Sequence, residues 1–98
     1  MKFERSISGR RVSVAHIYAD GGVEIEFGQL AGVAPFEAIE ARRELAQRLE
    51  RIDGVEIPED RLGRYPNFSM TFLRDGEHLE HFRQTVEWVF SEVERTAQ

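Results

Sequence analysis

The spacing of the apolar residues constrains the fold of this chain more than any other feature, because it changes along the sequence. Up to about residue 28, apolar residues stand at every second position, as in Phe3, Arg5 and Ile7, where an arginine takes one place in the row. Such alternation is typical of strands with one buried face. Ser8-Gly9 and Asp20-Gly21-Gly22 are typical turn sequences between such segments. The expected antiparallel meander consists of residues 2–7, 12–19 and 23–27.

A helical spacing follows over residues 35–52. The apolar residues expected on its buried side are Ala38, Ile39, Ala41, Leu45, Ala46, Leu49 and Ile52. Pro35 suits the first helical position because its missing N–H costs nothing there. Gly54 suits the left-handed residue that ends such a helix. Glu44 precedes Arg48 by four residues, the order that favours an ion pair on a helix surface.

The last part of the chain predicts a connector, a fourth strand and a second helix. Within the connector, residues 55–67, Val55–Ile57 are expected to form an edge strand that stops at Pro58. Alternation from Phe68 to Leu73 then predicts the fourth strand. Asp75 is expected to cap a helix that runs to about Arg95. Its apolar stripe is Leu79, Phe82, Val86, Val89, Phe90 and Val93.

The element order β-β-β-α-(β)-β-α indicates the α+β class, with a small antiparallel sheet packed against two long amphipathic helices. Helices that pack on each other beside a small sheet are the alternative arrangement. The 98 residues are enough for one domain, residues 1–98. We expect either a free small protein or a tail domain that is expressed separately.

The composition excludes several classes of protein. The absence of cysteine rules out disulfide scaffolds, thiolate nucleophiles and thiolate metal sites, and it fits a reducing compartment such as the cytoplasm. No apolar run is long enough to span a membrane, so no membrane association is expected. Residues 1–5 lack the apolar stretch of a signal peptide. We therefore expect a cytoplasmic protein.

Charge is unevenly distributed along the chain. The net charge is −5, and both expected helices are acidic, which argues against non-specific binding to nucleic-acid backbones. Residues 61–75 are basic, because Arg61, Arg64 and Arg74 stand against one acidic residue, and they also contain Tyr65. Arginine with an aromatic residue favours phosphate contacts and base stacking. These four residues are the candidate nucleic-acid site, although the flanking acidic residues favour pairing of the arginines with the acidic helices.

Trp88 lies off the apolar stripe of the last helix. At helical spacing it shares a side with His81, Thr85 and Glu92. Because tryptophan often anchors protein interfaces, these four residues are the candidate partner-binding surface. The alternative is a helix with two buried sides, on which Trp88 covers a sheet edge or the connector.

Two other groups have side chains suited to acid–base or metal chemistry. His78 and His81 are three residues apart, so one helical face presents both, as a metal site requires, but two ligands do not complete a site. Glu24 and Glu26 lie on one face of a strand, where paired carboxylates either divide acid and base roles or simply form a wet outer face.

The remaining motifs argue against known catalytic machinery. The glycines of Asp20-Gly21-Gly22 lack the Gly-Lys-Ser/Thr ending of a P-loop, and the dinucleotide fingerprint is absent. The chain has no Gly-x-Ser-x-Gly elbow. We therefore expect no catalytic residues, no metal and no cofactor.

Packing and turn residues carry a resemblance to one known module. They are Val23–Phe27, Pro35-Phe36, Ile52-Asp53-Gly54-Val55, Ile57-Pro58, Arg64-Tyr65-Pro66, Leu73, Asp75, Phe82 and Trp88-Val89. In this pattern the chain resembles an α+β module at the C-terminal ends of longer, uncharacterised bacterial proteins, some of them linked to nucleases or genome defence. The resemblance covers most of the chain and implies no catalytic residue.

The sequence as a whole predicts a non-enzymatic interaction module that binds a protein partner or itself, with sheet-edge pairing as one route to a dimer. A nucleic-acid-binding accessory module of a bacterial nuclease or defence system is the first alternative. A small metal-dependent enzyme that uses His78 and His81 is the second.

Overall fold

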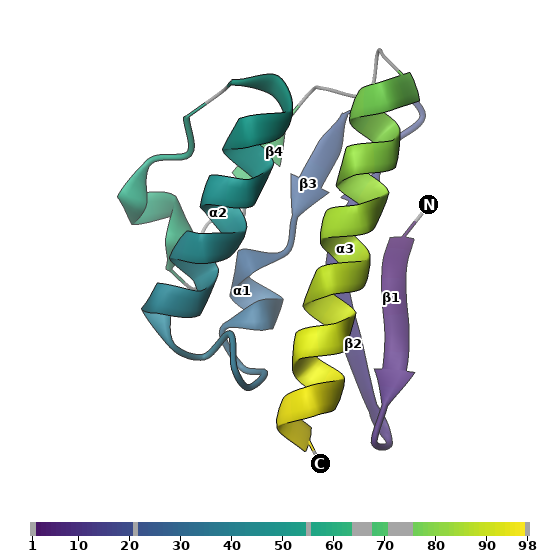
Figure 1. The fold of residues 1–98 in the computed structure, drawn as a ribbon, viewed down its shortest axis with the longest axis vertical. Helices are drawn as coiled ribbons and strands as arrows, with labels where there is room; N and C mark the ends of the chain where they lie inside the picture. The colour runs from purple at the N-terminus through teal and green to yellow at the C-terminus, as the bar shows by residue number, and fades with distance from the viewer. Residues whose placement is uncertain (1, 21, 55, 64–67, 71–75, 98) are drawn as a thin grey trace.

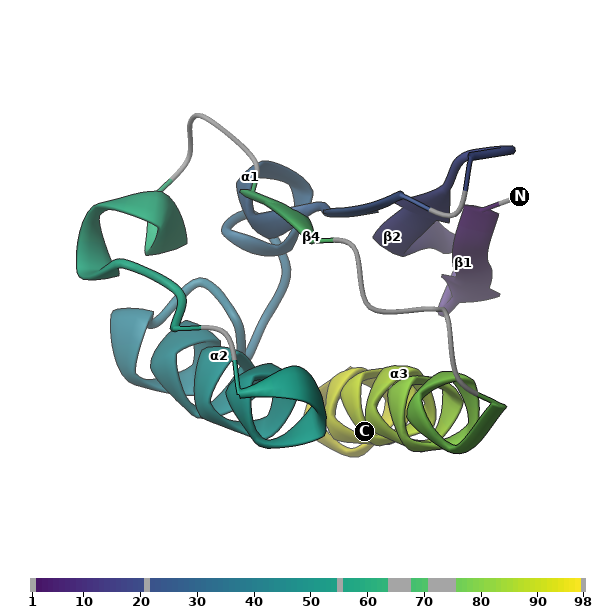
Figure 2. The same ribbon diagram turned by 90° about the horizontal axis from the view of Figure 1, so that it is seen from above.

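An antiparallel sheet forms one layer of the molecule and a pair of helices forms the other (Figures 1 and 2). The computed structural model describes residues 2–20, 22–54, 56–63, 68–70 and 76–97. Neighbouring strands pair in sequence order, and they are β1 (Lys2–Ile7), β2 (Arg10–Ile17), β3 (Val23–Ile25) and β4 (Phe68–Met70). The α+β class and the antiparallel arrangement of the first three strands are confirmed.

The turn between β1 and β2 follows from its two residues. Ser8 has φ 54° and Gly9 has φ 77°, so both lie in the left-handed region. Two successive positive φ values give the tight turn whose twist matches that of the flanking strands. The predicted turn at Ser8-Gly9 is therefore confirmed.

A β-bulge changes which residues of β2 face the core. Phe3 pairs with Ala15 and Glu4 pairs with Ser13, so Val14 is the extra residue. Val14 and Ala15 are consequently both buried, and after them Ile17 packs against the core. Simple alternation along residues 12–19 is thus interrupted.

The helical layer consists of two antiparallel helices that lie side by side (Figure 1). They are α2 (Ile39–Asp53) and α3 (Gly76–Ala97). Figure 2 shows α3 beneath β1 and β2, whereas α2 lies beneath α1 (Phe27–Leu30) and the 3-10 helix η1 (Glu59–Leu62). Gly54 ends α2 with φ 78°, as predicted from the sequence. Within the described residues, no helix has both the length and the apolar character needed to cross a membrane.

Two predicted boundaries were wrong: the end of the third strand and the start of α2. The third strand ends at Ile25, and Phe27 instead begins α1, because the amides of residues 29 and 30 bond back to the carbonyl of Glu26. Pro35 is not the first residue of α2. Its carbonyl accepts a 3.2 Å hydrogen bond from the amide of Ala38, a turn that precedes the helix.

Three further expectations need correction. Leu79 is 43% exposed, so the buried stripe of α3 starts one turn later, at Phe82. Ala38 is the exposed residue before α2 and not part of its buried side. Glu56 and Ile57 do not form a strand, because the amide of Ile57 bonds to the Glu50 carboxylate at 2.9 Å instead of to a neighbouring strand.

One hydrophobic core lies between the two layers. It consists of residues from the inner faces of the sheet and of both helices, together with loop residues around Phe36. Its buried members among the described residues are Ile7, Val12, Val14, Ala15, Val23, Ile25, Phe27, Leu30, Val33, Phe36, Leu45, Ala46, Leu49, Ile57, Leu62, Phe82, Val86, Val89, Phe90 and Val93.

Candidate functional site

Trp88 connects the core to the surface between α2 and α3. Its ring is partly buried, and it meets the ring of the buried Phe36 edge-on, with 5.7 Å between the ring centres. Trp88 also contacts Arg48, whose guanidinium carbon lies 3.9 Å from the centre of the Trp88 ring. This distance is within the range of a cation–π interaction. Trp88 is therefore held between an aromatic core residue and a cation.

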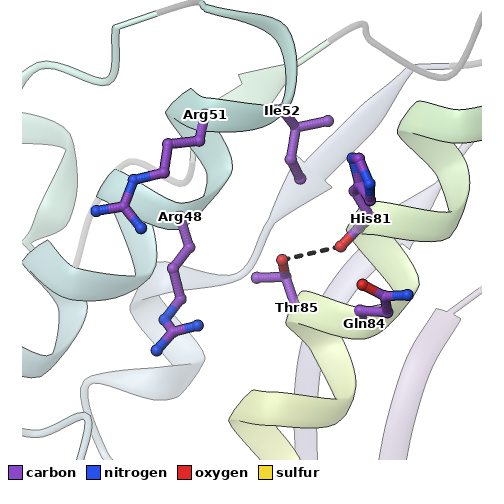
Figure 3. A pocket seen from close by; sticks show the side chains of 6 residues that line it. All are labelled: Arg48, Arg51, Ile52, His81, Gln84 and Thr85. Atoms are coloured by element: carbon purple, nitrogen blue, oxygen red, sulfur yellow. Dashed lines mark hydrogen bonds between the residues drawn. The ribbon is translucent and has the colours of Figure 1, made fainter.

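Two pockets lie along the seam between the helices, and with Trp88 they form what we call the α2–α3 groove. The larger pocket has a volume of about 340 Å³ and is lined by Arg48, Arg51, Ile52, His81, Gln84 and Thr85 (Figure 3). The smaller pocket, of about 150 Å³, is lined by Pro35, Phe36, Ala41, Glu44, Trp88, Glu92 and Arg95.

The four candidate partner-binding residues all line this groove. His81 and Thr85 belong to the larger pocket, whereas Trp88 and Glu92 belong to the smaller one. They form one row along α3 because they recur at intervals of three or four residues. The interpretation of this row as a binding surface stays a prediction.

Most of the side chains that line the larger pocket have polar groups, and several of their hydrogen bonds are local. The Thr85 hydroxyl donates to the carbonyl of His81 at 2.9 Å, and the Gln84 amide donates to the Glu80 carboxylate at 3.3 Å. Arg48 donates to Glu44 at 3.3 Å, which is the ion pair expected from the sequence. Across the described part of the chain, the side chain of Arg51 makes neither a hydrogen bond nor an ion pair.

An ion pair on α3 lies next in sequence to residues of the larger pocket. Arg83 donates two hydrogen bonds to Glu80, of 3.0 and 2.6 Å, and this holds the pKa of the Glu80 carboxyl below its usual range. Glu80 in turn raises the pKa of Arg83. His81 lies next to this pair in the sequence, on the wall of the pocket.

The structure shows how the other chemical candidates lie. His78 and His81 both belong to the first half of α3, but within the described residues no group of three or more histidines and carboxylates is arranged to hold a metal ion. Glu24 lies opposite His16 on the neighbouring strand, and the rings of His16 and Tyr18 stack at 4.4 Å. Loss of water contact, together with Glu24 and Glu26, raises the pKa of the Tyr18 hydroxyl. The two glutamates thus lie near an aromatic pair.

Most of the candidate nucleic-acid site lies outside the described residues. Arg61 belongs to η1, and its amide donates a 2.9 Å hydrogen bond to the carbonyl of Pro58. Arg64, Tyr65 and Arg74 lie outside the described residues, as do the predicted cap Asp75 and the second half of the predicted fourth strand.

Sequence reasoning missed the α2 half of the groove. Arg48 was expected only as part of an ion pair with Glu44, and Arg51 was not singled out, yet both line the larger pocket. The spacing of Arg48 and Arg51, next to Ile52, was the available signal, because residues three and four apart share a helical face.

Comparison with known proteins adds no relative. No protein-family model matches the chain, and no match is found among curated proteins or solved structures. The resemblance to the bacterial C-terminal module therefore stays a prediction.

Proposed function

We propose that this chain is a non-enzymatic interaction module that binds a protein partner or a second copy of itself in the α2–α3 groove. The observation that carries the proposal is the position of Trp88, which lines the smaller pocket and contacts both the buried Phe36 and Arg48, a residue of the larger pocket. An aromatic ring held in place loses little conformational entropy on binding, so it is well suited to anchor an interface.

The shape of the site supports the same function. Grooves between two helices accept a helix or an extended segment whose side chains enter successive pockets. His81 and Thr85 would contact the segment at the larger pocket, and Glu92 at the smaller one. The proposal includes the finer architecture predicted from the sequence. In it, a four-stranded sheet packs against two long amphipathic helices, and the groove lies between these helices. The proposal also includes a cytoplasmic location, which fits the absence of cysteine.

The test is to block the groove without disturbing the core. Thr85→Arg adds a bulky side chain to the wall of the larger pocket, and Gln47→Arg on an exposed position of α2 is the matched control. Proteins that the wild type captures from native lysate are identified and purified. Their direct binding to the wild type and to each of the two variants is then measured. Sedimentation of the purified chain measures self-association in parallel.

We expect direct binding, or self-association, that Thr85→Arg weakens at least tenfold and Gln47→Arg leaves unchanged. A chain that stays monomeric and has no direct partner contradicts the proposal. If the captured proteins are lost after nuclease treatment but are still captured by Thr85→Arg, the result would favour the nucleic-acid alternative.

A further inference from the structure

We propose that the larger pocket of the α2–α3 groove is a carboxylate-binding pocket, which takes a glutamate or aspartate side chain from an acidic segment of the protein partner. This inference rests on the proposed function, because it names the chemistry of the partner that enters the same groove.

The charge of the pocket lining is opposite to that of the chain. The sequence contains 18 acidic and 13 basic residues, yet none of the six residues that line the larger pocket is acidic. Arg48 and Arg51 supply positive charge from α2, and His81 supplies an imidazole ring from α3. Such a concentration of positive groups in a concave site attracts an anion.

The hydrogen-bond donors of the pocket are incompletely used. Arg48 makes one bond of 3.3 Å to Glu44, and its buried Nε has no acceptor among the described residues. Arg51 is exposed, and Figure 3 shows its guanidinium turned away from α3. Because no ion pair within the described residues holds Arg51, its side chain is free to turn toward a bound carboxylate. Arginine offers paired N–H groups that match the two oxygens of a carboxylate.

The opposite wall completes the site. Figure 3 shows His81, Gln84 and Thr85 on α3, across the pocket from Arg48 and Ile52 on α2. The Thr85 hydroxyl already donates its proton to the His81 carbonyl, so the imidazole of His81 is the more available donor on this wall. Ile52 adds an apolar surface, which suits a partner residue with an apolar side chain next to the carboxylate.

The surroundings of the pocket favour a single carboxylate over a polyanion. Glu44 lies beside Arg48, and Glu80 lies beside Gln84, so negative charge borders the pocket on both helices. A nucleic acid, which carries a phosphate on every nucleotide, would place further charges near these glutamates. A peptide carries its charges on separate side chains and avoids this repulsion.

The experiment uses a defined probe and the full chain. An isotope-labelled sample is titrated with a blocked peptide in which glutamates alternate with leucines, and the amide signals are followed by NMR. The matched probe has glutamine in place of glutamate. The variants are Arg51→Gln and His81→Gln, and Arg11→Gln is the control because Arg11 is an exposed arginine on β2.

We expect saturable shifts around residues 48–52 and 81–85, with binding of the glutamine peptide at least tenfold weaker. Arg51→Gln should weaken binding of the acidic peptide about tenfold, as loss of one charge-assisted hydrogen bond does, and Arg11→Gln should have no effect. Equal binding of both peptides overturns the proposal. Tighter binding of inorganic phosphate or of a single-stranded oligonucleotide at the same residues also overturns it.

The two proposals fail separately. A partner whose binding is lost in Thr85→Arg but kept in Arg51→Gln and His81→Gln supports the interaction module and contradicts the carboxylate pocket. A chain that binds the acidic peptide but has neither a direct protein partner nor self-association keeps the pocket and contradicts the module.

Discussion

The guanidinium of Arg42 on α2 donates a hydrogen bond of 2.6 Å to the backbone carbonyl of Leu62 at the end of η1. Arg42 is 8% exposed and is the one buried charged residue in the described part of the chain. Leu62 is itself a core residue. This bond therefore fixes η1 against the helix that forms one wall of the groove.

Replacing Arg42 with methionine keeps most of its apolar bulk but leaves the Leu62 carbonyl without its donor. A buried acceptor left unpaired costs about 1–3 kcal/mol, so we expect Arg42→Met to lower the free energy of unfolding by that amount. Urea denaturation measures it, and Gln47→Met on the exposed face of α2 is the control. Equal stability of wild type and Arg42→Met would show that the hydrogen bond contributes nothing.

The contact between Arg48 and Trp88 should be measurable as a coupling energy. We expect Trp88→Ala alone to cost about 2–4 kcal/mol, since the ring is partly buried against Phe36. In a double-mutant cycle with Arg48→Ala, we expect a coupling of about 0.5–1 kcal/mol for the cation–π contact. The same cycle with Arg51→Ala should give no coupling. Strictly additive effects of Arg48→Ala and Trp88→Ala would contradict this geometry.

The ion pair between Arg43 and Glu59 joins α2 to η1 and predicts a dependence of stability on pH. Its N–O distance is 2.5 Å, and the hydrogen bond from Arg43 holds the pKa of the Glu59 carboxyl below its usual range. Because the folded state lowers this pKa, the stabilisation is fully present above the unfolded-state value of about 4.3 and is lost as the pH falls through the folded-state value.

We therefore expect Glu59→Gln to be less stable than wild type at pH 7, by an amount that shrinks as the pH falls below about 4.3. Urea denaturation between neutral and acidic pH measures the difference. Glu56→Gln, at a nearby exposed position, is the control. A constant difference between Glu59→Gln and wild type over this range would rule out the linkage.

The end of α2 provides a matched pair of glycine substitutions. Gly54 has φ 78°, and an added Cβ would meet no atom within 4 Å, so Gly54→Ala has only a conformational cost. We expect it to destabilise the chain by about 1 kcal/mol. Gly76 also has open space around it but no positive φ, so Gly76→Ala should leave stability unchanged or slightly higher. Thermal unfolding of both variants tests the difference, and equal effects would argue against the left-handed cap.

Features set by neighbouring residues were predictable from the sequence. The turn at Ser8-Gly9, the end of α2 at Gly54 and the pair of Glu44 with Arg48 each follow from local backbone or side-chain rules. The row of His81, Thr85, Trp88 and Glu92 on one side of α3 was predictable for the same reason, since it depends only on helical periodicity.

Features set by contacts between distant segments were not predictable. The bulge at Val14 depends on the pairing of β1 with β2, and it moves Ile17 to the core side. The burial of Arg42 depends on a carbonyl twenty residues away, which no helical pattern reveals. The groove likewise exists because α2 and α3 pack side by side, so the α3 residues were found without the arginines that face them.

The position of Arg5 limits how this molecule can aggregate. Arg5 lies on β1, at an edge of the described sheet, yet its guanidinium points to α3, with Glu87 at 3.0 Å and Glu94 at 3.5 Å. It also lies 4.4 Å from the centre of the Phe90 ring. A strand added to β1 in a growing fibril would have to place a side chain beside this inward-facing charge. The edge thus opposes amyloid-like growth while its backbone stays open to solvent.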